Sequence, residues 1–214
     1  AQAAFDIIAF LTYKFQKGWA IFRAQHVYGH GEFDEIDMPF AKAEVVELTL
    51  DENIGKNLAK EVAKMYDKGF EGDPEFIMDK TTEVDLQFTK LIPGSTDSNR
   101  TVVQDGKCVG YRYKVSPFID YSFDEHGIGT KDADRYIGIG HFGYANEMVY
   151  ADGIDFNVDG RSQENFDRNV IALGMGLDYS LVEMSSKVNG NTSGKPQAFK
   201  LIKLIEPASS NEIG

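Results

Sequence analysis

Short apolar segments, each ended by turn-forming residues, are the feature of this sequence that most constrains its fold. The segments rich in aromatic, β-branched or alternating apolar residues are 17–28, 40–50, 84–91, 102–123, 148–158, 171–184 and 197–205. Gly, Pro, Asn and Asp stand between them, and the Asp105-Gly106 and Asp152-Gly153 pairs are typical of hairpin turns. Short strands of this kind favour a small barrel or sandwich over an α/β sheet.

One segment shows helical spacing instead. Asp51 offers an N-cap, and the apolar residues that follow recur every four positions until Gly69: Ile54, Leu58, Val62 and Tyr66. The opposite face carries Lys56, Lys60, Lys64 and Lys68, a row that is typical of a solvated helix face. The fold class predicted is mainly β, an OB-type barrel with one long helix and an inserted irregular segment at 127–144.

Composition narrows the class of protein. No segment approaches the roughly 18 apolar residues of a membrane span, so no membrane partner is expected. The single cysteine, Cys108, cannot form an intramolecular disulfide, which fits a reducing compartment. A net charge of −12 opposes non-specific attraction to nucleic acid, but a polyanion meets the local surface and not the total charge.

The segment 110–115 combines aromatic and basic residues. In a strand, Tyr111 and Tyr113 would share one face while Arg112 and Lys114 share the other. Such a strand could stack bases on its tyrosines and meet phosphates with its cations. Tyrosines that face the core and cations that face water would produce the same pattern.

Two further segments are candidates for binding. Trp19 and Phe22 interleave with Arg23 in the first expected strand, although a sole tryptophan is more often a core residue. Lys187 and Lys195 lie in a polar loop between the last two expected strands, which would form the closing hairpin of an OB barrel.

The order of these segments resembles the podovirus-type single-stranded DNA-binding proteins of bacteriophages. The blocks that carry the resemblance are KGWAIFRAQHVYG, AKAEVVELTL with DENIGKNLAKEVAKMYDKG, YRYKVSPFIDYSF, NVIALGMGLDYSLVEM and AFKLIKLIE. The resemblance implies one OB-type domain over residues 1–214 that coats unpaired strands in DNA replication and recombination. It implies contacts with the phage DNA polymerase and helicase-primase, a possible homodimer, and a location in the cytoplasm of the infected bacterial host.

Two positions and the C-terminus depart from that family. Asp178 stands where a basic residue is expected, and Met184 stands where an aromatic residue would stack on a base. The acidic tail of the family is not found after residue 206. Carried over by position, Lys114 falls on a basic site of the binding strand with Arg112 beside it.

Two other classes of function remain open. An enzyme would use His26 and His30 with Glu32 and Asp34 as metal ligands, but this spacing brings the histidines together only on a helix, and the segment is expected to be strand and loop. No catalytic arrangement and no cofactor motif is recognisable, so neither is expected. The alternative is a β-rich, non-catalytic virion or assembly protein, which the acidic, glycine-rich composition also suits.

Overall fold

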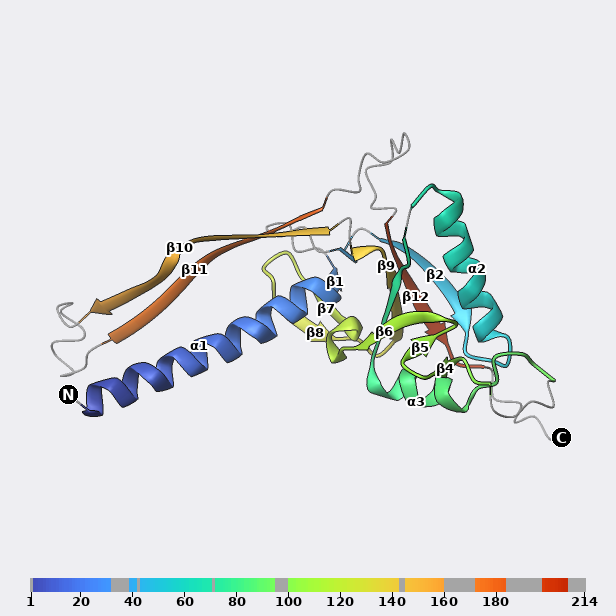
Figure 1. Cartoon of the computed structure of the whole chain (residues 1–214), viewed down its shortest axis with the longest axis horizontal. Helices are drawn as coiled ribbons and strands as arrows, with labels where there is room; N and C mark the ends of the chain where they lie inside the picture. The colour runs from blue at the N-terminus through green and yellow to red at the C-terminus, as the bar shows by residue number, and fades with distance from the viewer. Residues whose placement is uncertain are drawn as a thin grey trace.

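The computed structural model describes residues 2–31, 39–41, 43–70, 72–94, 100–142, 145–159, 172–183 and 198–207. The chain builds a main sheet with two helices, and a long helix and a two-stranded ribbon extend from it to one side (Figure 1). The helices are α1 Gln2–Tyr28, α2 Ile54–Asp67, α3 Lys80–Phe88 and the 3₁₀ turn η1 Pro117–Asp120. The strands are β1 His30–Gly31, β2 Glu44–Thr49, β3 Glu75–Met78, β4 Val103–Gln104, β5 Lys107–Cys108, β6 Tyr111–Val115, β7 Tyr121–Phe123, β8 Gly129–Lys131, β9 Arg135–Gly140, β10 Ala145–Asp159, β11 Ala172–Glu183 and β12 Phe199–Ile205.

The main sheet is open and mixed. Its seven strands run in the order β2-β12-β9-β3-β6-β5-β4, so β2 and β4 are its two edges within the described residues. Strand β12 is parallel to β2 and antiparallel to β9, and β3 is parallel to β6. The prediction of a closed OB barrel was therefore wrong, because the two edge strands do not pair with each other.

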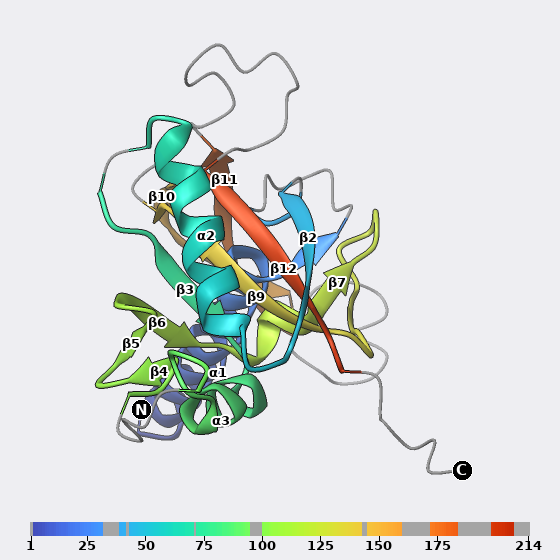
Figure 2. The same cartoon turned by 90° about the vertical axis from the view of Figure 1, so that its right-hand side faces the viewer.

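Helix α2 lies across one face of this sheet (Figure 2). Ile54, Leu58, Val62 and Met65 point into the sheet and are buried with Phe76. The i+4 spacing thus predicted this helix, although Asn53 and not Asp51 occupies its N-cap position. Glu61 of α2 also reaches the sheet and forms a buried ion pair with Lys200 of β12 at 2.7 Å.

A second cluster of buried residues packs on the other face of the sheet. It consists of Phe40, Ala43, Phe70, Ile77, Ile119, Tyr136, Ala198, Phe199 and Leu201. Strand β9 contributes side chains to both clusters, and its glycines permit close packing of the second cluster. A Cβ at Gly138 would lie 2.7 Å from the Phe40 ring, and one at Gly140 would lie 2.5 Å from the Phe199 ring.

The prediction of an irregular insertion at 127–144 was wrong over residues 135–140, which form strand β9. The glycines that suggest a loop are there because large aromatic side chains occupy the space above them. Strand β9 is buried along most of its length and pairs with both β12 and β3. It is an interior strand of the sheet, between β12 and β3.

The first expected strand, 17–28, lies instead in helix α1. The aromatic residues at 19, 22 and 28 favour a strand only when the segment is considered alone, and the helix continues from an apolar stretch that precedes it. Gly29 ends the helix, and its N–H donates to Gln25 O at 2.7 Å.

The strand expected at 84–91 was also wrong, because most of it forms helix α3. Asp79 caps this helix: its carboxylate accepts hydrogen bonds from the N–H groups of Thr82 at 2.8 Å and Thr81 at 3.1 Å. The cap lies five residues before the segment in which alternation was sought, so the start signal was missed.

Strands β10 and β11 form a long antiparallel ribbon of their own. Asp152-Gly153, expected to turn a hairpin, lies inside β10 at a register shift between Tyr150 and Asp155. Strands β11 and β12 were expected to close a barrel as one hairpin, but β11 pairs with β10 while β12 pairs with β2 and β9. The hairpin at Asp105-Gly106 was predicted correctly, and both residues have the positive φ that its turn requires.

Candidate interaction surfaces

The tyrosines of β6 pack toward the protein core. Tyr111 and Tyr113 are partly buried against the α2 side of the sheet. The Tyr113 hydroxyl donates to Glu83 Oε1 at 2.7 Å, and burial with this hydrogen bond raises the pKa of Tyr113 to about 12. The arrangement is that of structural tyrosines, the alternative that the sequence had left open.

The cations of β6 point to the opposite side and are exposed. Lys114 pairs with Glu75 at 2.8 Å and lies 5.8 Å from the centre of the Phe142 ring. The hydrogen bond to Glu75 raises the pKa of Lys114. Lys114 is thus engaged with its own chain, whereas Arg112 lies on the exposed face of the strand.

The remaining predicted binding residues do not belong to β6. Trp19, Phe22 and Arg23 belong to α1, where Trp19 stacks on Phe22 at 5.8 Å. This row continues through His26, whose ring lies 4.0 Å from Phe22 and 5.3 Å from Phe123 of β7. It therefore ties α1 to the rest of the protein. Lys187 and Lys195 lie outside the described residues.

The lysine row of α2 is a solvated face, as the sequence predicted. Lys56, Lys60 and Lys64 are exposed, and Lys64 pairs with Glu61 while Lys68 pairs with Glu44 at 3.3 Å. Two of the four lysines therefore pair with carboxylates of the same chain.

Among the residues that the structure describes, His26 and His30 do not form the group with acids that a metal site needs. His26 is buried beside Phe22, and burial lowers its pKa. His30 faces Asp132 at 3.2 Å. Across the described part of the chain, no group of three or more His, Cys, Asp or Glu side chains could hold a metal ion. Glu32 and Asp34 lie outside that part.

One polar cluster contains the residue types of a hydrolase triad in the wrong order. Ser122 Oγ donates to Asp132 Oδ1 at 2.7 Å, and the other oxygen of Asp132 faces His30. A triad needs the histidine between the serine and the acid, because the imidazole must take the hydroxyl proton. With Asp132 in the middle, Ser122 has no base in this cluster, which instead joins β1, β7 and the loop after β8.

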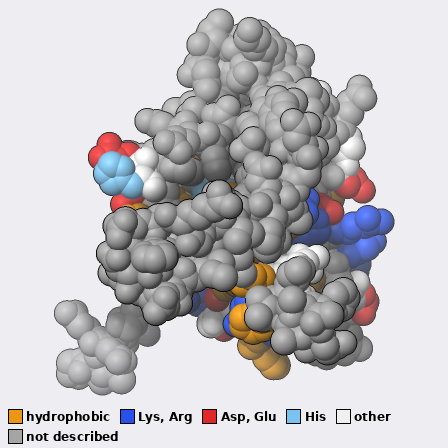
Figure 3. Space-filling model, turned by 90° about the vertical axis from the view of Figure 1, so that its left-hand side faces the viewer, with side chains coloured by type: hydrophobic (Ala, Val, Ile, Leu, Met, Phe, Trp, Pro, Cys, Tyr) orange, Lys and Arg blue, Asp and Glu red, His pale blue; other side chains and the backbone are white. Residues whose placement is uncertain are grey.

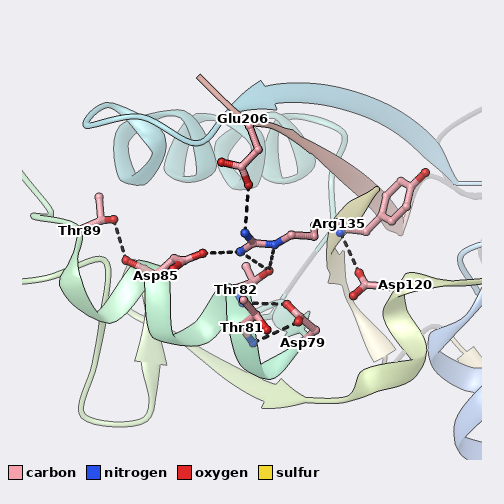
Figure 4. A network of polar contacts seen from close by, with 9 residues as sticks. Asp79, Thr81, Thr82, Asp85, Thr89, Asp120, Arg135 and Glu206 are labelled. Atoms are coloured by element: carbon pink, nitrogen blue, oxygen red, sulfur yellow. Dashed lines mark hydrogen bonds and ion pairs between the residues drawn. The ribbon is translucent and has the colours of Figure 1, made fainter. Parts of the chain in front are cut away.

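Arg135 of β9 links this strand to α3 and to the end of β12 through its guanidinium (Figure 4). Its guanidinium donates to Asp85 Oδ2 at 2.7 Å, to Thr82 Oγ1 at 3.0 Å and to Glu206 Oε1 at 3.1 Å. Beside it, buried Asp120 accepts the Tyr136 N–H at 2.9 Å. Burial raises the pKa of Asp120 to about 6.

Exposed apolar side chains are the surface feature that the sequence reasoning missed. Phe10, Tyr13 and Ile21 stand exposed on α1, and Val84, Phe88 and Ile92 stand exposed on and after α3. From the side on which α1 begins, hydrophobic side chains reach the surface beside basic ones (Figure 3). The i+4 spacing of 84, 88 and 92 was the available signal, but the segment had been interpreted as a strand. Apolar patches of this kind mark contact surfaces more often than catalytic sites.

No protein-family model and no curated protein matches the sequence. Solved structures do match the fold. The capsid of an empty GTA particle aligns with 93% of this chain and 66% of its own, at 15% identity and a TM-score of 0.56. The fold is similar to that of a capsid protein. A structure from Gordonia phage Cozz covers 92% of this chain and 64% of its own at 17% identity, with a TM-score of 0.60.

A structure from Mycobacterium phage Ogopogo matches 85% of the chain at 14% identity and a TM-score of 0.50. This chain spans about two thirds of the length of the structures it matches. The first of these structures is the capsid of a GTA particle and the other two come from bacteriophages, and what this chain shares with them is the fold. The resemblance to single-stranded DNA-binding proteins was therefore wrong, and the inferred contacts with unpaired DNA, a polymerase and a helicase-primase have no support. None of the helices in the described residues, α1 included, is long and apolar enough to cross a membrane.

Proposed function

We propose that this chain is a shell-forming subunit of a phage-type capsid, and that it acts by binding copies of itself and not by catalysis. The observation that carries the proposal is the shared fold over more than nine tenths of the chain, with a protein whose structure is that of a capsid. The alternative of a virion or assembly protein, which the sequence had left open, agrees with this fold.

The described surfaces suit a subunit whose exposed apolar residues are covered by neighbouring copies. Helix α1 and the β10–β11 ribbon extend from the main sheet (Figure 1), and α1 carries exposed aromatic residues such as Phe10 and Tyr13. An isolated helix gains little stability by itself in water, so a long helix that exposes apolar residues gains most from packing against another surface. Neighbouring copies in a shell would supply that surface, in the host cell in which a phage assembles.

The test is whether the purified chain assembles. Sedimentation velocity and electron microscopy, over a range of protein and salt concentrations, should show closed shells or the rings and sheets from which shells are built. A chain that stays monomeric at high concentration, under conditions in which it is folded, would contradict the proposal. Added single-stranded DNA is not expected to be needed for assembly.

A further inference from the structure

Two complementary features lie at the end of the molecule formed by α3 and the β4–β5 hairpin. The first is the α3 apolar patch, defined as Val84, Phe88 and Ile92. Phe88 is 84% exposed, which is the greatest exposure of any large hydrophobic residue in the described part of the chain. A phenylalanine so exposed loses the favourable free energy that burial of its ring would give, and none of the described residues of its own chain covers it.

The second feature is a hollow, which we name the tip pocket. Its volume is about 510 Å³, and its described lining consists of Leu91, Arg100, Thr101, Val102, Gln104, Asp105, Lys107, Val109 and Gly110. A cavity of about 150 Å³ can hold a benzene ring, so the tip pocket has room for a phenyl ring and an aliphatic neighbour. Leu91, Val102 and Val109 give it apolar walls.

The backbone holds the two features together. Leu91 N donates to Arg100 O at 3.0 Å, and Val102 N donates to Thr89 O at 2.9 Å, so the segment after α3 lies antiparallel to the wall of the tip pocket. The α3 apolar patch and the tip pocket are therefore fixed relative to each other, and a patch that projects from a chain cannot fill the pocket of that same chain.

Charge distinguishes the two features. Asp85 and Glu206 lie on the flank of α3, where they share the single guanidinium of Arg135 (Figure 4), which leaves one negative charge in excess. The tip pocket carries the cations Arg100 and Lys107 against one anion, Asp105. Lys90, the one cation within 84–92, already has a contact within its own chain. An apolar projection with an acidic flank thus matches an apolar pocket with a basic rim.

We infer that Phe88 of one copy of this chain inserts into the tip pocket of a second copy. The inference rests on the proposed shell function and names one contact within it. Because the projecting patch and the pocket are different surfaces of one chain, the contact is head-to-tail, and repetition of the contact generates a ring or an open chain of subunits.

The experiment removes each half of the contact and then mixes the halves. Phe88→Ser removes the projecting ring, Gln104→Trp fills the tip pocket from its wall, and Ile128→Ser is the matched control at an exposed apolar site elsewhere. Sedimentation velocity measures association, and thermal unfolding confirms that each variant is folded. We expect Phe88→Ser to weaken association by about 30-fold or more, as for a central aromatic residue of an interface, and Ile128→Ser to behave as the parent.

The mixture is the decisive measurement. In dilute solution, equal amounts of Phe88→Ser and Gln104→Trp should form dimers that neither variant forms alone, because the intact Phe88 of one variant can enter the open pocket of the other only once. If Gln104→Trp does not fold, Lys107→Glu replaces it, since reversal of a rim charge should also weaken the contact.

The possible outcomes separate this inference from the proposed function. Shell formation by Phe88→Ser at the parent's concentration, or the absence of dimers in the mixture of folded variants, would overturn the inference and leave the shell function standing. Open chains of subunits that depend on Phe88, with no rings, sheets or shells under any of these conditions, would support the inference and contradict the function. A parent chain that never associates would overturn both.

Discussion

Glycine substitutions test the packing of individual residues, because two glycines of this chain should respond in opposite ways. Gly138 lies in the buried strand β9, and an added Cβ would come within 2.7 Å of Phe40 and 3.0 Å of Ile119. We expect Gly138→Ala to lower the free energy of unfolding by about 1–3 kcal/mol through overpacking. Gly18 lies in α1 with open space around it, so Gly18→Ala should raise helix stability by up to about 1 kcal/mol.

Chemical denaturation of both variants beside the parent measures this difference. Two changes of the same sign would show that the tight approach of Phe40 to strand β9 does not determine the effect at Gly138.

Asp120 provides a second test at the scale of one residue, through the pH dependence of stability. Its pKa of about 6 in the folded chain exceeds its ordinary value of 3.8, because the side chain is buried. The folded state therefore holds the proton more tightly, and the free energy of unfolding should fall as pH rises from about 4 to 6. Asp120→Asn cannot ionise and can still accept the Tyr136 N–H, so it should escape this loss.

We expect Asp120→Asn to match the parent near pH 4 and to exceed its stability at pH 8 by up to about 3 kcal/mol. Asp105→Asn, an exposed turn substitution, is the control and should show little difference at either pH. Denaturant titrations at the two pH values measure this, and an advantage of Asp120→Asn that is equal at both would refute the assignment.

Among the elements, α3 depends on its cap more than α2 does. Both oxygens of Asp79 accept backbone N–H groups of the first turn of α3, whereas Asn53 at the start of α2 makes no such side-chain hydrogen bond. Burial would raise the pKa of Asp79, but the hydrogen bonds from Thr82 and Thr81 outweigh it and lower that pKa.

Asp79→Ala should therefore cost about 1–2 kcal/mol of stability, and Asn53→Ala should cost less than about 0.5 kcal/mol. The comparison of their unfolding midpoints in denaturant measures the difference. Equal costs would mean that packing of α3, and not its cap, fixes where the helix begins.

At the scale of the whole molecule, α1 and α2 should differ in how well their backbones are protected. Helix α2 buries five apolar or polar side chains against the sheet, whereas most of the described side chains of α1 are exposed or only partly buried. In dilute solution, amide hydrogens of α1 between residues 9 and 22 should exchange about tenfold faster than those of α2, or more.

Assembly should reverse this difference, because a neighbouring copy would cover part of α1. Hydrogen exchange read by mass spectrometry, on the free chain and on assembled material, tests both statements. Protection of α1 equal to that of α2 in dilute solution would show that α1 is already packed within the single chain.

The sequence by itself determined those elements whose signals are local. The i+4 repeat from Ile54 predicted helix α2, and the Asp105-Gly106 pair predicted the turn between β4 and β5. Each of these signals depends only on residues within one helix or one hairpin. The alternation in 110–115 specified strand β6, and its tyrosines packed inward as one of the two interpretations required.

Only the tertiary structure decided the fold, from which the function is proposed. Glycines in β9 suggested a loop, yet they lie there because Phe40 and Phe199, far away in the sequence, need the space. Aromatic residues in 17–28 suggested a strand, yet they form a row along α1 that reaches Phe123. The pairing of the strands gives an open sheet where a closed barrel was expected. This pairing depends on contacts between distant segments such as β2 and β12. Such contacts leave no local pattern, since each residue's preference is overridden by what packs against it.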